Sequence, residues 1–199
     1  MKKLKVNIKL NKNATIDSLL NENFDEIIIA TGAKPITVDL PGIYGENVVL
    51  AVDVINGIEV TGDKVLIVGG GMIGCETAEF LASQGKKVSI IEMLPKIARD
   101  IGPTTRWSVT MRINRWGIIL HTSSKVIRIT KSGVEIEREG DLELIEADTV
   151  VIAAGMESNN ELVNQLKGKL SNIHVIGDSS QARRMLDAIH EGYALGQKI

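Results

Sequence analysis

Residues 64–92 of the chain read KVLIVGGGMIGCETAEFLASQGKKVSIIE, and this stretch decides the fold. The continuous apolar run at 65–68 predicts a strand buried on both faces, as in a parallel sheet. A glycine-rich turn follows, and a helix is expected from about Met72 until Gly85 ends it. The next apolar run, 88–91, predicts a second strand. A strand, a turn, a helix and a strand in this order predict an α/β fold of the Rossmann type.

The turn carries the spacing G-x-G-x-x-G at Gly69, Gly71 and Gly74. The first glycine permits the tight turn, the second lets a pyrophosphate approach the backbone, and the third lets the helix pack closely on the strand. Free N–H groups and the positive end of the helix dipole are expected to face the phosphates. The residues expected to contact a dinucleotide here are Gly69, Gly70, Gly71, Met72, Ile73 and Gly74.

Glu92 ends the second strand, 18 residues after Gly74 (92 − 74). An acid at about this distance accepts hydrogen bonds from the adenosine ribose of a dinucleotide. The preceding strand, the following helix and this acid together favour a dinucleotide site over a merely structural turn. The carboxylate favours NADH over NADPH, because it repels a 2′-phosphate. Lys96 and Arg99 lie just downstream and offer positive charge to such a phosphate, so NADPH stays the alternative.

The composition excludes several classes of protein. The 199 residues carry 23 basic and 25 acidic side chains, a net charge of −2 and only 3% aromatic residues, so we expect no nucleic-acid partner. Cys75 is the single cysteine, which excludes an internal disulfide, a redox cysteine pair and a cysteine-ligated cluster within the chain. No stretch has the length and apolarity of a membrane span or a signal peptide. These features predict a soluble, cytoplasmic protein without a membrane partner.

The segments before the glycine-rich turn predict three further elements. We expect a half-buried strand at 5–10, a short helix at 16–20 and an apolar strand at 24–30. The segment 40–54 contains Leu40-Pro41-Gly42 and is expected to be a loop that connects two lobes.

The segments after the turn predict a helix at 104–116 and then mainly short strands. Trp107 and Trp116 are expected to have a structural role, with both side chains packed in the core. Turn residues separate four strands that resemble an antiparallel meander laid over the parallel sheet. The expected elements are the meander strands 118–121, 125–129, 134–138 and 142–145, buried strands at 149–153 and 173–176, and a final helix at 183–197.

Four short motifs follow one another along the chain. They are Ala30-Thr31-Gly32-x-x-Pro35, the glycine-rich turn, Ala154-Gly155 and Gly177-Asp178. In this order they resemble the motifs of the pyridine nucleotide-disulphide oxidoreductases, flavoproteins with two dinucleotide-binding domains. Residues 69–78 and 177–192 look most like the C-terminal part of 2,4-dienoyl-CoA reductases, 2-enoate reductases and related NADH:flavin oxidoreductases.

The resemblance implies an NAD(H)-binding Rossmann-like domain, residues 58–152, inserted into an FAD-binding lobe formed by residues 1–57 and 153–199. In relatives of this kind the FAD lobe begins with its own glycine fingerprint, and nothing before Ala30 supplies one. The chain therefore resembles a piece of a longer flavoenzyme, with FAD bound in the complete protein. Its expected partners are dinucleotide cofactors and the FAD and FMN portions of the parent enzyme, and unpaired apolar strands predict self-association.

The resemblance also implies individual roles outside the glycine-rich turn. Asp178 matches an aspartate that accepts hydrogen bonds from the ribityl chain of FAD, and the Thr31–Gly32 turn lies near that cofactor. Glu76 matches an acid that faces the nicotinamide. The alternatives are a turn-capping role for Asp178 and a solvated helix acid at Glu76. Further residues expected to contact a cofactor are Gly155 and Gly177.

The implied reaction is transfer of a hydride from NADH to FAD, in a parent enzyme that reduces an enoate or dienoyl-CoA double bond. No residue of this chain is expected to act as a catalytic acid, base or nucleophile, and the histidines lack metal-ligand spacing. Cys75 is expected to be a small buried packing residue. Two alternatives stay open: a non-catalytic module that binds NADH and senses redox state, and a stand-alone NAD-dependent dehydrogenase. No Tyr-x-x-x-Lys pair follows the fingerprint to support the latter.

Overall fold

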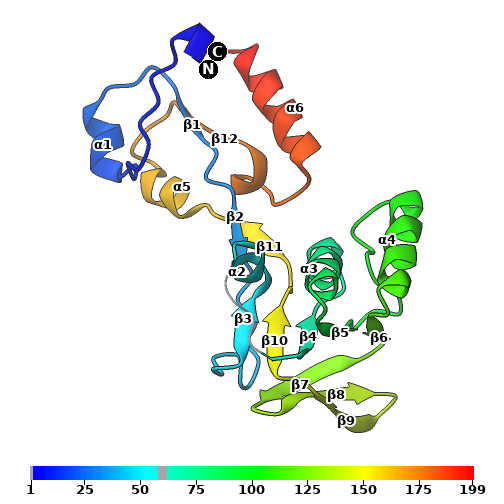
Figure 1. The fold of residues 1–199 in the computed structure, drawn as a ribbon. Coiled ribbons are helices and arrows are strands. Elements are labelled where there is room, and N and C mark those ends of the chain that lie inside the picture. The colour runs from blue at the N-terminus through cyan, green and yellow to red at the C-terminus, as the bar shows by residue number, and fades with distance from the viewer. Residues whose placement is uncertain (1, 58–61) are drawn as a thin grey trace. The chain divides into compact units, whose positions relative to one another are not determined.

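The computed structural model describes residues 2–57 and 62–199 of the chain (Figure 1). These residues form two compact units. The central unit comprises residues 35–156, and the flank unit comprises residues 1–34 and 157–199.

The boundaries of these units differ from the predicted domain boundaries. Residues 35–57 and 153–156, which the sequence analysis assigned to the FAD lobe, belong to the central unit. The reason is strand pairing, because residues 48–50 form a strand that joins the sheet of the central unit. The predicted first residue of the inserted domain, residue 58, lies outside the described residues.

A five-stranded parallel sheet organises the central unit, with the strand order β3-β10-β4-β5-β6. Its strands are β3 (Val48–Leu50), β4 (Lys64–Val68), β5 (Lys87–Ile91), β6 (Ile119–His121) and β10 (Thr149–Ile152). Parallel strands need crossover connections, and helices supply those from β3 to β4, from β4 to β5 and from β5 to β6. These helices are α2 (Ala51–Ile55), α3 (Met72–Ser83) and α4 (Pro103–Arg115). The strand, turn, helix and strand predicted from residues 64–92 are confirmed.

The middle strand β4 is buried on both faces, as its continuous apolar sequence predicts. Val65 and Ile67 pack with Leu81 of α3 in one hydrophobic cluster. Leu66 faces the other side and packs with Val134 in a second cluster. The sheet is therefore covered by helices on one side and by further strands on the other.

The strands on the second side form the antiparallel sheet β7-β8-β9. They are β7 (Lys125–Thr130), β8 (Gly133–Arg138) and β9 (Asp141–Glu146), which confirms three strands of the predicted meander. The fourth predicted strand, 118–121, is present, but its assignment to the meander is wrong. Residues 119–121 form β6, which pairs in parallel with β5 and extends the main sheet. The crossover through α4 delivers this segment to the free edge of β5.

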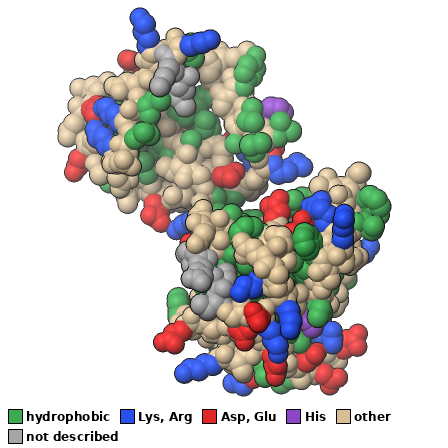
Figure 2. Space-filling view, viewed as in Figure 1, with side chains coloured by type: hydrophobic (Ala, Val, Ile, Leu, Met, Phe, Trp, Pro, Cys, Tyr) green, Lys and Arg blue, Asp and Glu red, His purple; other side chains and the backbone are tan. Residues whose placement is uncertain are grey.

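The flank unit has a small core. Its strands β1 (Ile27–Ile29) and β12 (Ile173–Val175) form a parallel pair. Among its described residues, the buried members of its hydrophobic cluster are Ile27, Ile29 and Leu166. Hydrophobic side chains are visible on its surface (Figure 2). The other elements are η1 (Lys2–Leu4), α1 (Ile16–Asn21), α5 (Glu161–Leu166), η2 (Gly177–Ser179) and α6 (Met185–Gly196). None of the residues of α6 is buried.

Two short strands lie where the chain passes from one unit to the other. They are β2 (Ala33–Pro35) and β11 (Met156–Ser158), and they pair with each other. Within the described residues, no helix has both the length and the apolarity that a bilayer crossing requires.

Three further predicted elements differ from the structure. The strand predicted at 5–10 is wrong, because these residues are exposed and pair with no strand of the described ranges 2–57 and 62–199, and alternation alone does not form a ladder. The apolar strand predicted at 24–30 is limited to β1. The segment 40–54 is not a simple loop, because it contains β3 and the start of α2.

The predicted burial of the tryptophans is also wrong. Trp107 is 68% exposed and Trp116 is 49% exposed. The helix α4 turns Val109 and Ile113, four residues apart, into the core, and both are fully buried. Trp107 lies two residues before Val109, on the opposite side of the helix.

Candidate functional site

The loop after β4 begins at Gly69, whose φ of +111° is unfavourable for a residue with a side chain. Its N–H donates to the carbonyl oxygen of Ile91 at 2.9 Å, which joins the loop to the end of β5. A Cβ atom on residue 69 would lie 2.4 Å from the carbonyl oxygen of Ala153, just after β10. A glycine is required here because the ends of three strands meet at this point.

Gly74 lies in the first turn of α3, where this helix is closest to the loop. A Cβ atom on residue 74 would lie 1.9 Å from the carbonyl oxygen of Gly69. No carbon atom fits at that distance from an oxygen. The close packing of helix on strand that the third glycine predicts is therefore confirmed.

The N-terminus of α3 is the place where the sequence predicts free N–H groups. Gly71 is the N-cap residue, and a Cβ atom on it would lie 3.4 Å from a carboxylate oxygen of Asp100. The N–H of Met72 donates to Oδ2 and Oδ1 of Asp100 at 3.0 and 3.2 Å. The prediction of a free amide is wrong for Met72, because an anion of the protein itself occupies the position that the helix dipole favours.

Glu92 follows β5 and is half-buried beside the same loop. Its Oε2 accepts a hydrogen bond from the N–H of Gly70 at 2.7 Å, and its Oε1 accepts one from the N–H of Leu94 at 2.8 Å. Each carboxylate oxygen keeps a further lone pair, so Glu92 is able to accept a ribose hydroxyl without losing either bond. Folding thus brings the acid to the glycine-rich turn, as the spacing predicts.

A segment that the fingerprint spacing does not predict lies against the glycine-rich loop. The N–H of Ala98 donates to the carbonyl oxygen of Gly70 at 2.6 Å. The guanidinium of Arg106 donates to the carbonyl oxygens of Ala98 and Ile101 at 2.9 and 3.0 Å. Asp100 lies between these anchor points. Nothing in the fingerprint spacing indicates either Asp100 or Arg106, because both act through contacts with main-chain groups.

Cys75 is fully buried, as its interpretation as a packing residue predicts. Burial raises the pKa of its thiol to about 12, and the nearby carboxylates of Asp100, Glu79, Glu92 and Glu76 add to the increase. The thiol is therefore protonated at neutral pH and is a poor nucleophile. Glu76 itself is exposed on α3, just after the first turn of the helix.

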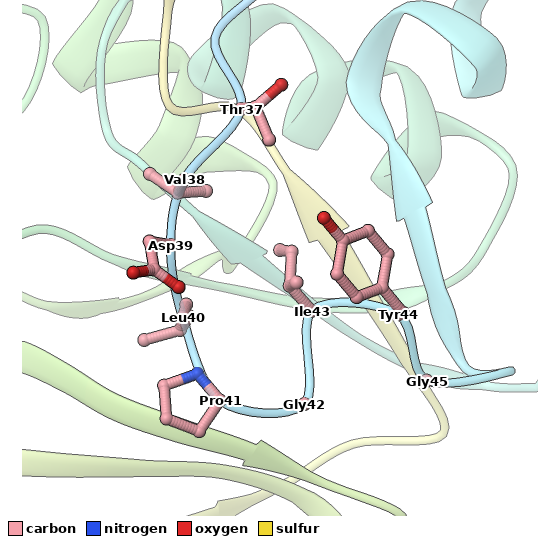
Figure 3. Close-up of a pocket in the computed structure, with 9 residues that line it drawn as sticks. All are labelled: Thr37, Val38, Asp39, Leu40, Pro41, Gly42, Ile43, Tyr44 and Gly45. Carbon is pink, nitrogen blue, oxygen red and sulfur yellow. The ribbon is translucent and has the colours of Figure 1, made fainter.

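Of two cavities in the central unit, one is lined by predicted cofactor-binding residues and the other is not. One of about 200 Å³ brings Ile73 and Gly155 together, with an otherwise mainly apolar lining that includes Val52 and Ile55. Another of about 740 Å³ is lined by the single loop 37–45 (Figure 3) and contains none of the predicted site residues. The first cavity is therefore the one associated with the fingerprint helix.

The remaining predicted residues lie in the flank unit, after the carboxyl ends of the paired strands β1 and β12. The hydroxyl of Thr31 donates to the carbonyl oxygen of Asn159 at 2.6 Å, and the carbonyl oxygen of Gly32 accepts from the N–H of Asn159 at 2.9 Å. These bonds fix the turn after β1. Because parallel strands end at the same edge, the structure brings this turn and the Gly177–Asp178 turn to one edge of the strand pair.

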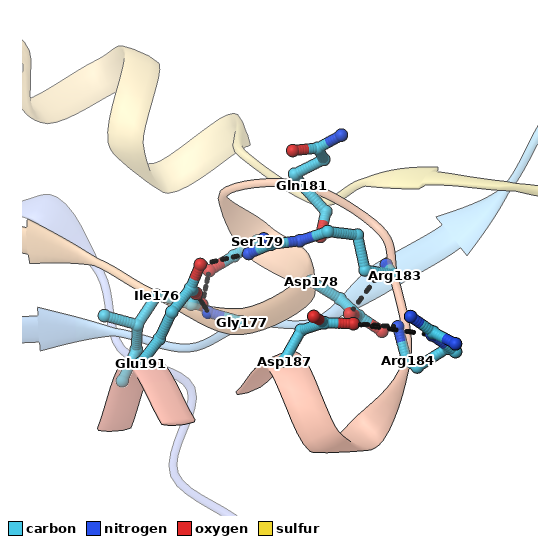
Figure 4. A network of polar contacts seen from close by, with 9 residues as sticks. All are labelled: Ile176, Gly177, Asp178, Ser179, Gln181, Arg183, Arg184, Asp187 and Glu191. Carbon is cyan, nitrogen blue, oxygen red and sulfur yellow. Dashed lines mark hydrogen bonds and ion pairs between the residues drawn. The ribbon is translucent and has the colours of Figure 1, made fainter. Parts of the chain in front are cut away.

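The turn after β12 is held by charged side chains (Figure 4). Oδ1 of Asp178 accepts a hydrogen bond from the N–H of Arg183 at 3.1 Å, so this carboxylate caps the following turn. The N–H of Gly177 donates to Oε2 of Glu191 at 2.6 Å, and Glu191 also pairs with the guanidinium of Arg183. The Arg183 guanidinium and then the Gly177 amide lower the pKa of Glu191. The N–H of Gly177, a residue expected to contact FAD, is thus hydrogen-bonded to the Glu191 carboxylate of the protein itself.

Comparison with known proteins identifies related reductases and a related oxidase. A metal reductase of Desulforamulus reducens is 34% identical, over 96% of this chain and 33% of that protein. An NADH oxidase of Thermoanaerobacter brockii is 35% identical, over 98% of this chain and 31% of that protein. A cinnamate reductase of Clostridium sporogenes is 33% identical, over 100% of this chain and 30% of that protein. The chain therefore spans about a third of the length of the curated relatives that it matches.

The fold comparison agrees with the sequence comparison. The solved structure of 2-naphthoyl-CoA reductase in complex with 2-naphthoyl-CoA is 35% identical, with a TM-score of 0.94 over 100% of this chain and 30% of that chain. The family described as pyridine nucleotide-disulphide oxidoreductase matches residues 2–187. From the match over nearly its whole length, the chain belongs to the pyridine nucleotide-disulphide oxidoreductase family.

Proposed function

We propose that the central unit binds NAD(H) at the loop 69–74 and forms the nicotinamide-nucleotide part of a flavin-dependent oxidoreductase. The observation that carries the proposal is the convergence of this loop, the N-terminus of α3 and Glu92. Gly69 and Gly74 bring main-chain atoms so close that no side chain fits between them. Glu92 is bonded to the loop itself through the N–H of Gly70. This combination suits a pyrophosphate at the helix N-terminus and a ribose at the acid.

The proposed orientation of the nucleotide follows from the polarity of the site. The pyrophosphate lies against Gly71 and Met72, and Glu92 accepts hydrogen bonds from the adenosine ribose. The mainly apolar cavity beside Ile73 and Gly155 suits the nicotinamide ring. In this orientation a 2′-phosphate lies next to the Glu92 carboxylate, so NADH is preferred over NADPH.

In the proposed complete enzyme, FAD is held partly by the flank unit, at the edge that carries Thr31, Gly32, Gly177 and Asp178. FAD supplies the acceptor for the hydride of NADH when both are bound. The protein's contribution is to orient the two rings and to exclude water, and no side chain of this chain acts as acid or base. The named relatives include a cinnamate reductase and a CoA-ester reductase, which support an enoate or dienoyl-CoA double bond as the final acceptor.

The first test replaces Gly71 with valine and measures NADH binding by calorimetry. The backbone of residue 71 is extended, and the three atoms nearest to the added Cβ atom all belong to the flexible Asp100 side chain, so the variant is expected to fold. Its branched side chain obstructs the approach of the pyrophosphate, and NADH affinity is expected to fall by about ten-fold or more. Gly196→Val, in open space on α6, is the matched control. Equal NADH affinity of the wild type and Gly71→Val contradicts the proposed site.

A second test replaces Glu92 with glutamine. The amide has nearly the same shape as the carboxylate but carries no charge. The ratio of NADPH to NADH dissociation constants is expected to fall, because the repulsion of the 2′-phosphate is lost. An unchanged ratio removes Glu92 from the ribose pocket.

The flavin part of the proposal is tested by the visible absorption spectrum of the purified chain, with and without added FAD, before and after anaerobic addition of NADH. Bound flavin that bleaches with NADH supports hydride transfer within this chain. NADH binding without flavin restricts the chain to the nucleotide-binding step. Flavin that is bleached by NADH contradicts the alternative of a non-catalytic NADH-binding module.

A further inference from the structure

The carboxylate of Asp100 lies where the proposed function requires a phosphate. Both of its oxygens accept a hydrogen bond from the N–H of Met72, at 3.0 and 3.2 Å. The helix behind this amide, α3, has 12 residues, so its N-terminus carries a full helix-dipole charge. We propose that Asp100 is an internal competitor of the cofactor, which leaves the Met72 amide when a pyrophosphate binds and so sets the affinity of the site. This inference rests on the proposed function and adds a regulation of the same site.

The main chain that carries Asp100 is held in place on both sides. Before it, Ile97 and Ala98 are buried, and the N–H of Ala98 donates to the carbonyl oxygen of Gly70 at 2.6 Å. After it, the carbonyl oxygen of Ile101 accepts a hydrogen bond from Arg106 at 3.0 Å. The side chain of Asp100 is itself exposed. Rotation of this side chain alone therefore releases the amide, and the loop does not have to open.

The competition is electrostatic as well as geometric. The Met72 N–H has one hydrogen to donate, and a carboxylate and a phosphate that approach it together repel each other. After displacement, Asp100 stays close to the bound pyrophosphate, because its main chain is fixed. Glu92 does not conflict in this way, since it faces a neutral ribose hydroxyl. The two acids beside the loop thus have opposite effects, one that supports the ribose and one that opposes the phosphates.

The test compares the wild-type chain with Asp100→Asn in calorimetric titrations with NADH, ADP-ribose and adenosine. Asparagine keeps the shape of the side chain and an oxygen acceptor for Met72, but it removes the charge. An acid at an exposed helix N-terminus contributes about 0.3–1 kcal/mol, which converts to a two- to five-fold change in affinity. NADH and ADP-ribose, which contain the pyrophosphate, are expected to bind about two- to five-fold more tightly to the variant. Adenosine, which lacks phosphate, is expected to bind equally to both.

Asp141→Asn is the matched control, because it makes the same chemical change at an exposed position in β9. It is expected to leave all three affinities unchanged, which excludes an effect of net charge alone. The gain in Asp100→Asn is also expected to shrink in high salt, because salt screens the repulsion.

The possible outcomes separate this inference from the proposed function. If NADH binds both proteins equally, or binds Asp100→Asn more weakly, Asp100 is only a helix cap and the inference is overturned, while the nucleotide site stands. If adenosine gains affinity as much as NADH does, the effect does not act through the phosphates and the inference is also overturned. If neither protein binds NADH, the proposed function fails, and the inference fails with it.

Discussion

Gly74→Ala tests the close approach of α3 to the strand ends. In an open helix position this substitution stabilises a protein by up to about 1 kcal/mol. At residue 74 the new methyl group would lie 1.9 Å from the carbonyl oxygen of Gly69, which is about 1.5 Å short of ordinary contact. Because that oxygen belongs to the main chain, α3 has to move away and its packing against β4 is lost. We expect a loss of about 3 kcal/mol or more in the free energy of unfolding.

Urea unfolding followed by tryptophan fluorescence is the assay that isolates this loss. Both tryptophans of the chain, Trp107 and Trp116, belong to the central unit, on or directly after α4. The fluorescence transition therefore reports on the unit that contains Gly74. With a urea dependence of about 1–3 kcal/mol per molar, the midpoint is expected to fall by about 1 M or more.

Gly196→Ala is the control for the residue change itself. Residue 196 is the last residue of α6, and a Cβ atom there meets nothing within 4 Å. The fluorescence midpoint of this variant is expected to equal that of the wild type. A Gly74→Ala midpoint as high as the wild-type midpoint would refute the reasoning, because it would mean that the strand and the helix have room for a side chain.

Three further predictions concern the two cores and the surface. Cys75 is expected to resist iodoacetamide at pH 8 in the folded protein and to react once urea unfolds it, and rapid alkylation of the native protein contradicts this expectation. Its pKa in the folded protein, about 12, lies above the ordinary 9.0. The contribution of the buried thiol to stability is therefore complete below pH 9 and is lost as the pH rises toward 12. Leu166→Ala, in the core of the flank unit, is expected to lower the free energy of unfolding measured by circular dichroism by about 2–5 kcal/mol and to leave the tryptophan fluorescence transition unchanged. A shift of both signals together would show that the two units unfold as one. The exposed apolar side chains of α6, such as Leu186 and Ile189, predict self-association in light scattering, and a strictly monomeric chain at high concentration counts against it.

Residues 64–92 predicted the centre of the fold because every local signal there agrees. A continuous apolar strand, three glycines at fixed spacing and a helix that ends in glycine are compatible with few arrangements. The spacing also predicted that Glu92 reaches the turn, and the structure joins it to Gly70 at 2.7 Å. That part of the candidate site was available from the sequence because the crossover unit is local and its geometry recurs.

The predictions that were wrong depended on contacts between distant segments. Residues 5–10 alternate as a strand does, yet no strand in the described part of the chain pairs with them. The strands 48–50 and 119–121 are short, and their place in the sheet depends on pairing with β10 and with β5. Trp107 is large and apolar, but Val109 and Ile113 set the buried face of α4. Local composition does not contain this information.

The sequence by itself determined the strand–glycine–helix unit, the place of Glu92 beside the glycine-rich turn and the family resemblance, because each depends on residue types at short, fixed distances. Only the tertiary structure decided the unit boundaries and the neighbours of the helix N-terminus. Asp100 is 28 residues from Met72 and reaches it through a loop that Arg106 fixes by hydrogen bonds to carbonyl oxygens. Such contacts use main-chain groups that nearly every residue has, so no pattern of side chains in the sequence predicts them.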